Sequence, residues 1–423
     1  MRVLLAGASG FIGRHLLRSL LADGHEVVAT SRSGIGPQLP GVRWLALDLE
    51  RLALESDSFV WPADIDLLIN ATGLLDSDAG RLARAQDLGA RRLFDLAAAG
   101  NARILQFSAL GAGEQADVPF LASKAAADEY LLGLGVSAVV LRPSLVLGAG
   151  GASSAWLMRL SPWPLIPLLD TRARAQPLHI DDLVAAVLAL LRRWPTHPTV
   201  LPLVGPEAMS VPQLLDLLRQ AQGWSPARYL ALPRMLLRPL AGLGDRLGWR
   251  ALNRQTVQLA ARDNLAAAEP LAAACGYRAA PLHSRLDGWP RRADSVAATM
   301  RTLMLLALTI IWLGTAVVCL GPGRDWGLEI MAQLGVHGAM ASASIVGGAL
   351  LDALLGLGLL WRRWRRIALL AQIGLMLGYM VIISLWLPHY WFDPFAAVGK
   401  NLVLLVATLW LWLTEPSLDK GAR

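Results

Sequence analysis

The stretch Gly7-Ala8-Ser9-Gly10-Phe11-Ile12-Gly13 decides how the first part of this chain folds. An apolar run over residues 1–8 leads into it and predicts a buried strand. An amphipathic pattern to about residue 23 predicts a helix, and the apolar run 26–30 predicts a second strand. A strand, a glycine-rich turn, a helix and a second strand in this order predict a turn that binds the phosphates of a dinucleotide.

Each glycine of this turn has its own role. Gly7 permits the tight turn, Gly10 lets the backbone approach a pyrophosphate, and Gly13 lets the helix pack on the strand. Free N–H groups and the dipole at the helix start favour an anion. We therefore predict a cofactor-binding turn that comprises Gly7, Ser9, Gly10, Phe11, Ile12 and Gly13.

The end of the second predicted strand reads Thr30-Ser31-Arg32-Ser33. A carboxylate at this place binds the ribose 2′-OH of the cofactor, whereas an Arg accepts a 2′-phosphate. The stretch has no acidic residue, and the guanidinium of Arg32 can bind a phosphate through two N–H groups. The sequence therefore favours NADP(H) over NAD(H). The alternative, that Arg32 is a solvated loop residue, stays open.

Strand-like apolar runs recur along the chain, and helix-like segments separate them. The runs lie at 42–47, 66–71, 103–107 and 137–141, and helices are expected at 81–99 and 121–134. This alternation predicts an α/β, Rossmann-like, doubly wound parallel sheet. Ligands of such sheets bind beyond the carboxyl ends of the strands. The cofactor-binding residues predicted there are Asp48, Leu49, Ala71, Thr72, Gly73 and Pro143.

The composition of the 423 residues indicates a membrane part joined to a soluble part. Hydrophobic residues make up 55% and charged residues 17%, against about 25% charged residues in ordinary soluble proteins. The net charge of +7 is spread over the chain, without the one-sided basic cluster of a nucleic-acid binder. Two cysteines exclude a disulfide scaffold, and no Cys or His grouping has metal-ligand spacing. We expect neither a nucleic acid nor a metal as a ligand.

Four apolar stretches follow residue 300. They run over 302–321, 338–360, 367–387 and 397–413. A helix needs about 20 residues to cross a bilayer core, and the first three stretches reach that length. The fourth is shorter, but Trp410 and Trp412 suit a membrane interface at its far end. We predict an all-α transmembrane domain of four helices.

The distribution of basic residues orients these helices. Three Arg precede the first stretch, and four more occupy the loop 362–366 between the second and the third. The opposite loops hold only Arg324 and, where the fourth stretch begins, Lys400. We therefore expect a multi-pass protein of the cell inner membrane, with membrane lipids around it. The N-terminal domain, the Arg loop and the C-terminus are expected in the cytoplasm.

Asp352 lies inside the second apolar stretch, among many small residues. A carboxylate within a membrane costs a few kcal/mol unless it is paired or hydrated. Gln372, Arg366 and Tyr379 are the partners that we consider. A structural polar clamp and a ligand or proton site both stay open.

Residues 1–295 resemble the extended and atypical short-chain dehydrogenase/reductase superfamily. The phrase 107–112 resembles the atypical branch, which contains the NADPH-holding 39-kDa accessory subunit of respiratory complex I. The resemblance implies a nicotinamide cofactor and a place for Lys124 on its ribose. The membrane part resembles DoxX-like domains through residues 352–356, the Arg loop and Gln372. The motifs that carry the first resemblance are the glycine-rich turn, Asp48-Leu49, Asn70-Ala71-Thr72-Gly73, Ser108, Lys124, Leu141-Arg142-Pro143 and residues 177–182.

One position departs from the family's catalytic signature, Tyr-x-x-x-Lys. Lys124 is present, but Phe120 stands at the Tyr position, and a phenyl ring has no proton to give. Tyr130 is six residues past Lys124 and is not expected on the same helix face. The resemblance assigns catalytic roles to Ser108 and Lys124. For both residues, ordinary strand-end and helix polarity is the alternative.

The resemblance also implies the domain order. A first domain of 1–295 contains a small substrate lobe mainly within 151–285, and a DoxX-like domain of 296–415 and a tail of 416–423 follow. Basic residues interrupt the apolar run 229–249, which predicts either a helix on lipid headgroups or a buried helix. His179 precedes two Asp; in the family such a phrase begins a packing helix, and a metal or base cluster is the alternative.

The sequence thus indicates a membrane-anchored NAD(P)-dependent oxidoreductase that transfers hydride to a quinone or another apolar substrate such as a lipid. The alternative is a non-catalytic NADPH-binding structural or sensing module of a membrane protein complex, which Phe120 favours. A transporter-like domain gated by nucleotide is a third hypothesis, and only Asp352 supports it.

Overall fold

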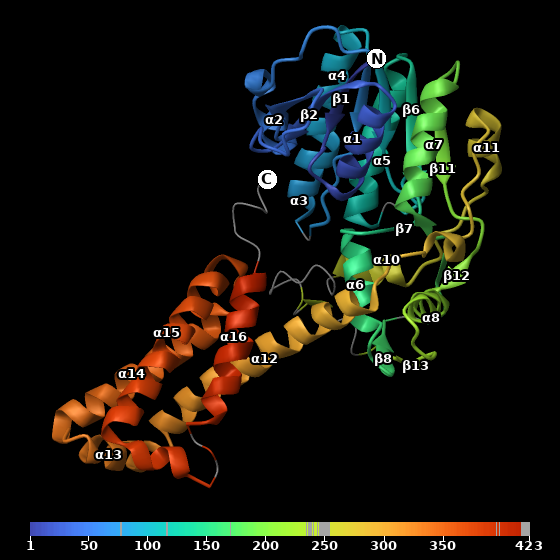
Figure 1. The fold of residues 1–423 in the computed structure, drawn as a ribbon. Helices are drawn as coiled ribbons and strands as arrows, with labels where there is room; N and C mark the ends of the chain where they lie inside the picture. Colours follow the sequence, from blue (N-terminus) through green and yellow to red (C-terminus); the bar gives the residue numbers. More distant parts are fainter. Residues whose placement is uncertain are drawn as a thin grey trace. The chain divides into compact units, whose positions relative to one another are not determined.

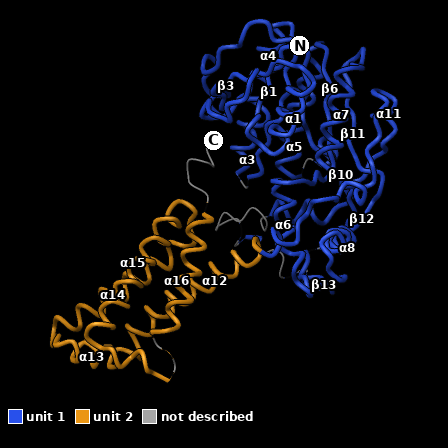
Figure 2. Tube along the Cα trace, in the orientation of Figure 1, with its two compact units in different colours: residues 1–296, 423 blue, residues 297–422 orange. Residues whose placement is uncertain are grey.

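The computed structural model describes residues 1–415 except 77, 116, 170, 234, 236–238, 240, 243, 245–253, 395 and 397. It divides into two compact units, Met1–Val296 and Ala297–Ala422 (Figure 2). The predicted tail 416–423 and part of the run 229–249 lie outside the described residues, so neither interpretation of that run is tested.

Seven parallel strands form the central sheet of unit 1, in the order β11-β6-β5-β4-β1-β2-β3 (Figure 1). The inner strands are mostly buried, and their central residues are apolar on both faces, as a parallel sheet that is covered on both faces requires. The predicted Rossmann-like, doubly wound sheet is therefore confirmed. The strands are β1 (Arg2–Ala6), β2 (Glu26–Ser31), β3 (Val42–Ala46), β4 (Leu67–Asn70), β5 (Arg103–Phe107), β6 (Ala138–Pro143) and β11 (Thr199–Leu203).

Helices cover both faces of this sheet. On one face, α1 (Phe11–Ala22) and α7 (Ile180–Arg192) bury their leucines against it, and α11 (Glu269–Cys275) packs on α7. On the other face lie α2 (Leu49–Leu54), α4 (Gly89–Ala99) and α5 (Pro119–Gly133). Helix α3 (Ala79–Leu82) and a π-helical turn, Ala83–Leu88, lead into α4.

The strand order reverses between β1 and β4, which places a crevice at their carboxyl ends. The register pairs Leu5 with Ile69 and Ala6 with Asn70, so both strands end at the same level. The loop that begins at Gly7 and the loop that begins at Ala71 therefore meet at the crevice. This is where the sequence predicts the cofactor.

Apart from α7, β11 and α11, which belong to the main sheet and its cover, elements after β6 build a smaller lobe with its own core, in which Leu157, Ile166, Leu214 and Leu218 are buried. Short strand pairs hold it together: β7 with β10, β8 with β13, and β9 with β12. Its elements are β7 (Val146–Leu147), α6 (Ala152–Leu160), β8 (Leu165–Leu168), β9 (Arg174–Ala175), β10 (Leu178–His179), β12 (Met209–Ser210), α8 (Val211–Ala221), β13 (Arg228–Ala231), α10 (Arg254–Ala260) and a 3-10 turn, Leu282–Arg285.

Unit 2 is helical, and each predicted apolar stretch lies on a helix. Three of its helices are long and apolar enough to span a membrane, and α16, with 15 residues, falls short of the usual length of about 20. Large side chains such as Ile310, Val317 and Leu354 are exposed on this unit, as expected of a surface that faces lipid. The helices are α12 (Arg292–Leu320), α13 (Arg324–Gln333), α14 (Gly338–Gly358), α15 (Arg362–Trp386), the 3-10 turn Pro388–Phe392 and α16 (Lys400–Thr414).

An ion-pair cluster joins three helices within unit 2. Arg301 binds Glu415 and donates to the Thr414 hydroxyl at 2.8 Å. Arg365 lies 3.6 Å from the other oxygen of Glu415 and donates to the carbonyl of Leu359 at 2.7 Å. The start of the first apolar stretch, the Arg loop and the end of α16 therefore lie at one end of this unit, as the predicted topology requires.

Candidate nucleotide-binding site

The glycine-rich turn leaves no room for side chains at two of its three glycines. Gly7 has a φ of +77°, a left-handed conformation, and a Cβ on it would lie 3.0 Å from the carbonyl oxygen of Ala71. A Cβ on Gly13 would lie 2.7 Å from the Cα of Ala8. The Gly10 N–H donates to the Gly7 carbonyl at 2.9 Å and closes the turn. The backbone itself therefore forms the wall of the crevice.

The first turn of α1 presents backbone N–H groups without a competing anion. Gly10 is the N-cap residue; among the described residues no side chain caps this helix, and no acidic residue lies in its first turn. Helix starts without such partners bind phosphate or other anions. The turn thus fits the pyrophosphate of a dinucleotide cofactor.

Arg32 lies just past the end of β2, on an exposed turn. The Ser31 hydroxyl holds this turn, because it accepts from the Ile35 N–H at 3.1 Å and donates to the Ile35 carbonyl at 2.9 Å. Asp48 caps α2, where one carboxylate oxygen accepts the Glu50 N–H at 2.9 Å, and Leu49 is buried beside it. The contacts predicted for Arg32, Asp48 and Leu49 with a cofactor stay predictions.

The loop after β4 is fastened next to the glycine-rich turn. Asn70 accepts from the Thr72 hydroxyl at 2.6 Å and donates to the Gln106 side chain at 2.7 Å. The Ala71 N–H donates to the Ala6 carbonyl at 3.0 Å. A Cβ on Gly73 would meet no atom within 4 Å, so the crevice is open at this position. The structure thus brings together the predicted residues Gly7, Ala71, Thr72 and Gly73.

Lys124 joins the ends of β4 and β5 from helix α5. Its ammonium donates to the carbonyls of Thr72 and Phe107, each at 2.9 Å, and its side chain is almost fully buried. Burial lowers the pKa of Lys124 to about 8, although Asp128 opposes the shift. These contacts use two of the three N–H groups of an ammonium, which leaves one for a ligand.

Ser108 belongs to a buried network that the sequence analysis missed. Its hydroxyl lies 2.6 Å from Asp128 Oδ2, the same oxygen that accepts from Arg142 Nη2 at 3.0 Å. Burial raises the pKa of Asp128, and Ser108 and Arg142 oppose the shift. Asp128 Oδ1 is buried without a hydrogen-bond partner in the described part of the chain. Asp128 follows Lys124 by four residues, so the sequence places both on one face of α5, but this spacing does not reveal the contacts of Asp128 with Ser108 and Arg142.

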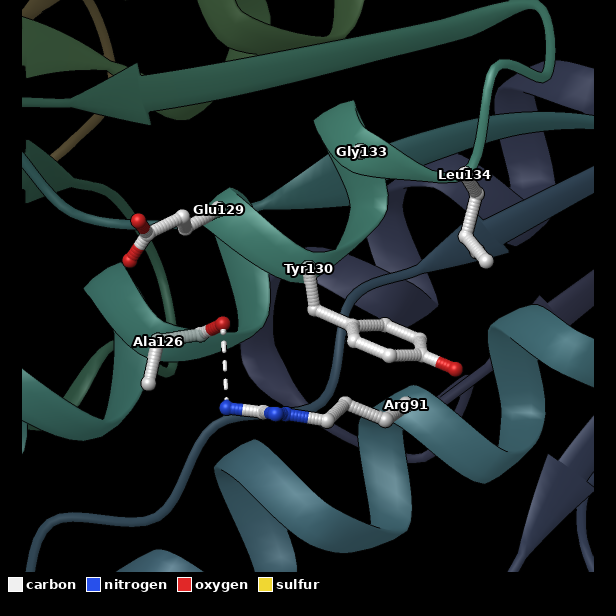
Figure 3. A pocket seen from close by; sticks show the side chains of 6 residues that line it. All are labelled: Arg91, Ala126, Glu129, Tyr130, Gly133 and Leu134. Atoms are coloured by element: carbon white, nitrogen blue, oxygen red, sulfur yellow. Dashed lines mark hydrogen bonds between the residues drawn. The ribbon is translucent and has the colours of Figure 1, made fainter.

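Phe120 occupies the first turn of α5, half-buried and one turn before Lys124. Tyr130 does not replace the missing tyrosine, because its hydroxyl donates to Asp95 at 2.6 Å between α4 and α5. This hydrogen bond raises the pKa of Tyr130. Arg91 lies over the Tyr130 ring, 5.0 Å from its centroid, and lines a pocket with it (Figure 3). The pocket does not include any of the predicted cofactor-binding residues.

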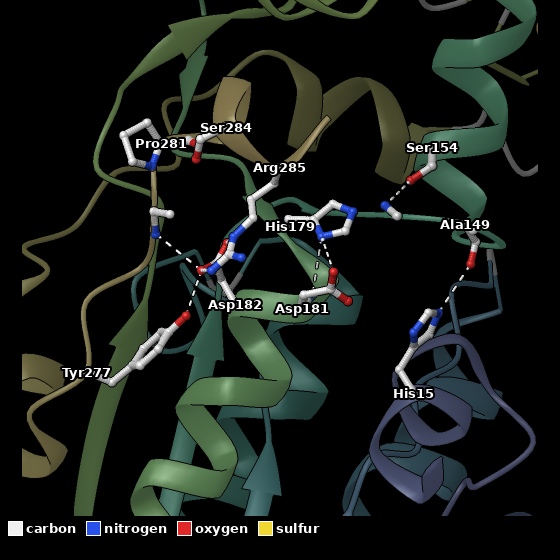
Figure 4. Close-up of polar contacts among 12 residues, drawn as sticks. His15, Ala149, Ser154, His179, Asp181, Asp182, Tyr277, Pro281, Ser284 and Arg285 are labelled. Atoms are coloured by element: carbon white, nitrogen blue, oxygen red, sulfur yellow. Dashed lines mark hydrogen bonds and ion pairs between the residues drawn. The ribbon is translucent and has the colours of Figure 1, made fainter. Parts of the chain in front are cut away.

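A second glycine-rich loop, residues 148–151, packs against the start of α1. Arg14 donates to the Gly150 carbonyl at 2.7 Å, and His15 Nε2 lies 3.3 Å from the Ala149 carbonyl (Figure 4). A Cβ on Gly151 would lie 3.0 Å from the ring of Phe11. The predicted cofactor residue Phe11 therefore has its side chain under this loop, and only its backbone can belong to the phosphate turn. The loop extends the wall of the crevice beyond Pro143, the last residue of β6.

The phrase 177–182 begins a packing helix, as the family pattern implies. His179 Nδ1 accepts the Asp181 N–H at 3.4 Å and caps α7, and burial lowers the pKa of His179. Asp182 is fully buried and accepts from the Tyr277 hydroxyl at 2.6 Å and from Arg285 at 2.9 Å (Figure 4). This network ties the segment 277–285 to α7.

Two known families match parts of the chain. Residues 3–200 match the NAD dependent epimerase/dehydratase family, and residues 309–409 match the DoxX-like family. The N-terminal domain is therefore of the short-chain dehydrogenase/reductase type and the C-terminal domain is DoxX-like, so both resemblances are confirmed.

Curated relatives match the soluble part. Ceramide reductase from Caulobacter vibrioides is 29% identical over 201 residues, which are 45% of this chain and 61% of the relative. NADH dehydrogenase [ubiquinone] 1 alpha subcomplex subunit 9, mitochondrial, from Dictyostelium discoideum is 26% identical over 228 residues, 50% of this chain and 61% of the relative. The match thus spans 61% of the length of each of these relatives.

A solved structure shares the fold of the soluble part. MoeE5 in complex with UDP-glucuronic acid and NAD has a TM-score of 0.54 and 20% identity, over 71% of this chain and 100% of that one. At this identity the likeness shows the fold alone.

Proposed function

We propose that this chain, which joins a domain of the short-chain dehydrogenase/reductase type to a DoxX-like membrane domain, is a membrane-anchored NAD(P)-dependent oxidoreductase for an apolar substrate. The observation that supports the proposal is the crevice between the glycine-rich turn after β1 and the loop after β4. There a left-handed Gly7, an uncapped helix start and the open side of Gly73 leave a backbone-lined crevice.

In this proposal, different residues of the crevice bind different parts of the cofactor. The backbone of residues 7–13 would hold the pyrophosphate, Asp48 and Leu49 would contact the adenine part, and the free N–H of Lys124 would bind a ribose hydroxyl. Arg32 accepts a 2′-phosphate, which favours NADP(H) over NAD(H). Ala71, Thr72, Gly73 and Pro143 line the remaining wall. Hydride exchange is the chemistry that a nicotinamide cofactor supplies when bound.

The proton that reduction of a carbonyl requires has a different source here than in enzymes with the Tyr-x-x-x-Lys signature. Phe120 has no proton to give, whereas Ser108 carries a hydroxyl at the same end of the sheet. The Ser108 hydroxyl, which donates to Asp128 at 2.6 Å, turns to the substrate and donates to its carbonyl oxygen, while Asp128 stays bound to Arg142. Water supplies the proton.

The substrate class follows from the membrane part and from one relative. Three helices of spanning length support a location in a membrane, where an apolar substrate is found. The similarity to a ceramide reductase supports a long-chain lipid as substrate, and a quinone is the other candidate. We place the protein in the cell inner membrane with its N-terminal domain in the cytoplasm, because the Arg loop and the end of α16 share one end of unit 2.

A second function has its own supporting observation. The Ser108 hydroxyl is committed to Asp128, and Phe120 removes the usual acid, so the site can hold a nucleotide without turning it over. In that case the domain is a structural or sensing NADPH module of a membrane complex. The similarity to a subunit of NADH dehydrogenase supports this alternative.

One experiment separates the two functions. The full chain is purified in mild detergent and loaded with NADPH, and the near-ultraviolet absorbance of the reduced nicotinamide is followed. A ceramide precursor in its keto form, a quinone and an extract of native membrane lipids are then added in turn. Loss of absorbance that a Gly10→Trp variant does not show establishes an oxidoreductase. A bound cofactor that persists with every addition establishes the non-catalytic module.

A further inference from the structure

The interior of unit 2 contains two polar side chains whose hydrogen bonding is incomplete. Asp352 on α14 is 5% exposed and Gln372 on α15 is fully buried. Asp352 Oδ1 and Gln372 Oε1 are both buried without a hydrogen-bond partner in the described part of the chain. The buried Thr309 and Thr408 differ, because each donates its hydroxyl to a carbonyl of its own helix.

The two side chains belong to one helix–helix interface. The Gln372 amide donates at 3.2 Å to the carbonyl of Leu355, which lies three residues after Asp352 on α14. One turn before Asp352 on α14, a Cβ on Gly348 would lie 3.6 Å from the hydroxyl of Tyr379 on α15. The charge of Asp352 also interacts electrostatically with Tyr379 and with Cys319 on α12. Polar groups of α14 and α15 therefore lie along one seam between these two helices.

The two unpartnered atoms are both hydrogen-bond acceptors. An acceptor buried in a membrane without a donor costs free energy, so both atoms require an O–H or N–H group that no hydrogen bond in the described part of the chain supplies. Asp352 lies six residues before the end of α14, roughly 9 Å below the end that carries the Arg loop.

We propose that Asp352 and Gln372 form a binding site for a lipid whose head donates hydrogen bonds, such as an N-acyl amino alcohol with hydroxyl and amide N–H groups. A quinone fits less well because its carbonyl and ether oxygens only accept. Tyr379, beside the narrow Gly348, completes the site with a hydroxyl that can donate or accept. The proposal concerns unit 2 alone and does not depend on turnover in unit 1.

Native mass spectrometry of the full chain in detergent tests the site. The chain is titrated with N-palmitoyl sphingosine, which carries two hydroxyls and an amide N–H, and separately with ubiquinone. We expect saturable binding of N-palmitoyl sphingosine to the unmodified chain. A double variant, Asp352→Leu with Gln372→Leu, should bind it at least tenfold more weakly. Thr408→Val is the matched control, because it removes a buried hydroxyl that is already satisfied.

A second variant covers the case in which the double variant does not fold. Asp352→Asn keeps the shape of the side chain and supplies an amide donor for Gln372, so it should fold and yet bind N-palmitoyl sphingosine about tenfold more weakly. Binding that is unchanged in either folded variant overturns the proposal and leaves a structural clamp between α14 and α15. Ubiquinone binding that equals that of N-palmitoyl sphingosine and falls equally in both variants also overturns it.

Discussion

The burial of Lys124 leads to a prediction of how the stability of the folded chain depends on pH. Its pKa is about 8 in the folded chain and 10.5 ordinarily, so the buried charge costs stability below pH 8. This cost disappears as the pH rises towards 10.5, because the folded state then binds fewer protons than the unfolded state. Over this range, stability relative to a Lys124→Met variant should rise by an amount on the order of 3 kcal/mol. Thermal unfolding of both proteins between pH 7 and 10.5 measures it, and a constant difference contradicts the burial argument.

Arg32 tests the choice between the two nicotinamide cofactors. Arg32→Asp should weaken NADPH binding by about 10- to 100-fold, because a charge-assisted contact with the 2′-phosphate is lost, and leave NADH binding nearly unchanged. Arg43→Asp makes the same charge change at another exposed position, on β3, and should affect neither. Calorimetric titrations with both nucleotides measure the effect. Equal weakening of NADPH and NADH by Arg32→Asp would refute the role of Arg32.

Phe120 tests the proton route. Phe120→Tyr restores a phenol one turn before Lys124, and we expect it to raise the rate of reduction of small carbonyl compounds by about 100-fold, the lower end of what acid catalysis contributes. Steady-state rates with NADPH measure this effect. If the variant instead abolishes an activity that the unmodified chain has, Phe120 shapes the substrate pocket and the proton does not depend on position 120.

At the scale of single residues, the sequence predicted the parts of the site that lie in one short motif. Gly7 and Gly13 could be predicted because turn geometry constrains them locally, and Lys124 was predicted from the resemblance to short-chain dehydrogenases/reductases; their contacts with a cofactor stay predictions. Asp128 could not be predicted in this way, because its role depends on contacts with Arg142 and Ser108, which lie at the ends of two different strands. Likewise, no local pattern shows that Phe11 packs under the loop 148–151.

At the scale of elements, most strands and helices of unit 1 follow from hydrophobic periodicity. Strand β11 was not predicted, because Pro202 interrupts its apolar run; the sheet tolerates the proline since β11 is an edge strand. Helix α13 was not predicted either, because its residues mix charged and apolar side chains between two membrane stretches. Its formation depends on packing against α14, which the sequence does not reveal.

The buried Asp182 allows an element-scale prediction with a matched control. Asp182→Ala removes the acceptor for Tyr277 and Arg285, and we expect a loss of about 3 kcal/mol in the stability of unit 1, as for a broken buried ion pair. Asp181→Ala changes the adjacent carboxylate, whose side chain is 64% exposed, and should cost less than about 1 kcal/mol. Denaturant unfolding of the full chain compares them. Similar losses in both variants would mean that the Asp182 network does not fasten α7.

At the scale of the whole molecule, the topology can be tested directly. In a chain without Cys275 and Cys319, single cysteines replace Arg324 and Arg363 in intact cells. A membrane-impermeant thiol reagent should label the Arg324→Cys chain from outside and the Arg363→Cys chain only after the membrane is opened, because the distribution of basic residues predicts that the Arg loop faces the cytoplasm. The reverse pattern would overturn the predicted orientation.

The central claim is that the crevice between β1 and β4 binds a nicotinamide cofactor, and calorimetric titration of NADPH into the full chain in detergent tests it most directly. The account predicts saturable binding of one nucleotide per chain. It predicts that Gly10→Trp abolishes this binding, whereas Gly133→Trp, at a glycine with open space around it on α5, does not. Binding of equal strength in the Gly10→Trp chain, or no binding of NADPH or NADH by the unmodified chain, would contradict the account.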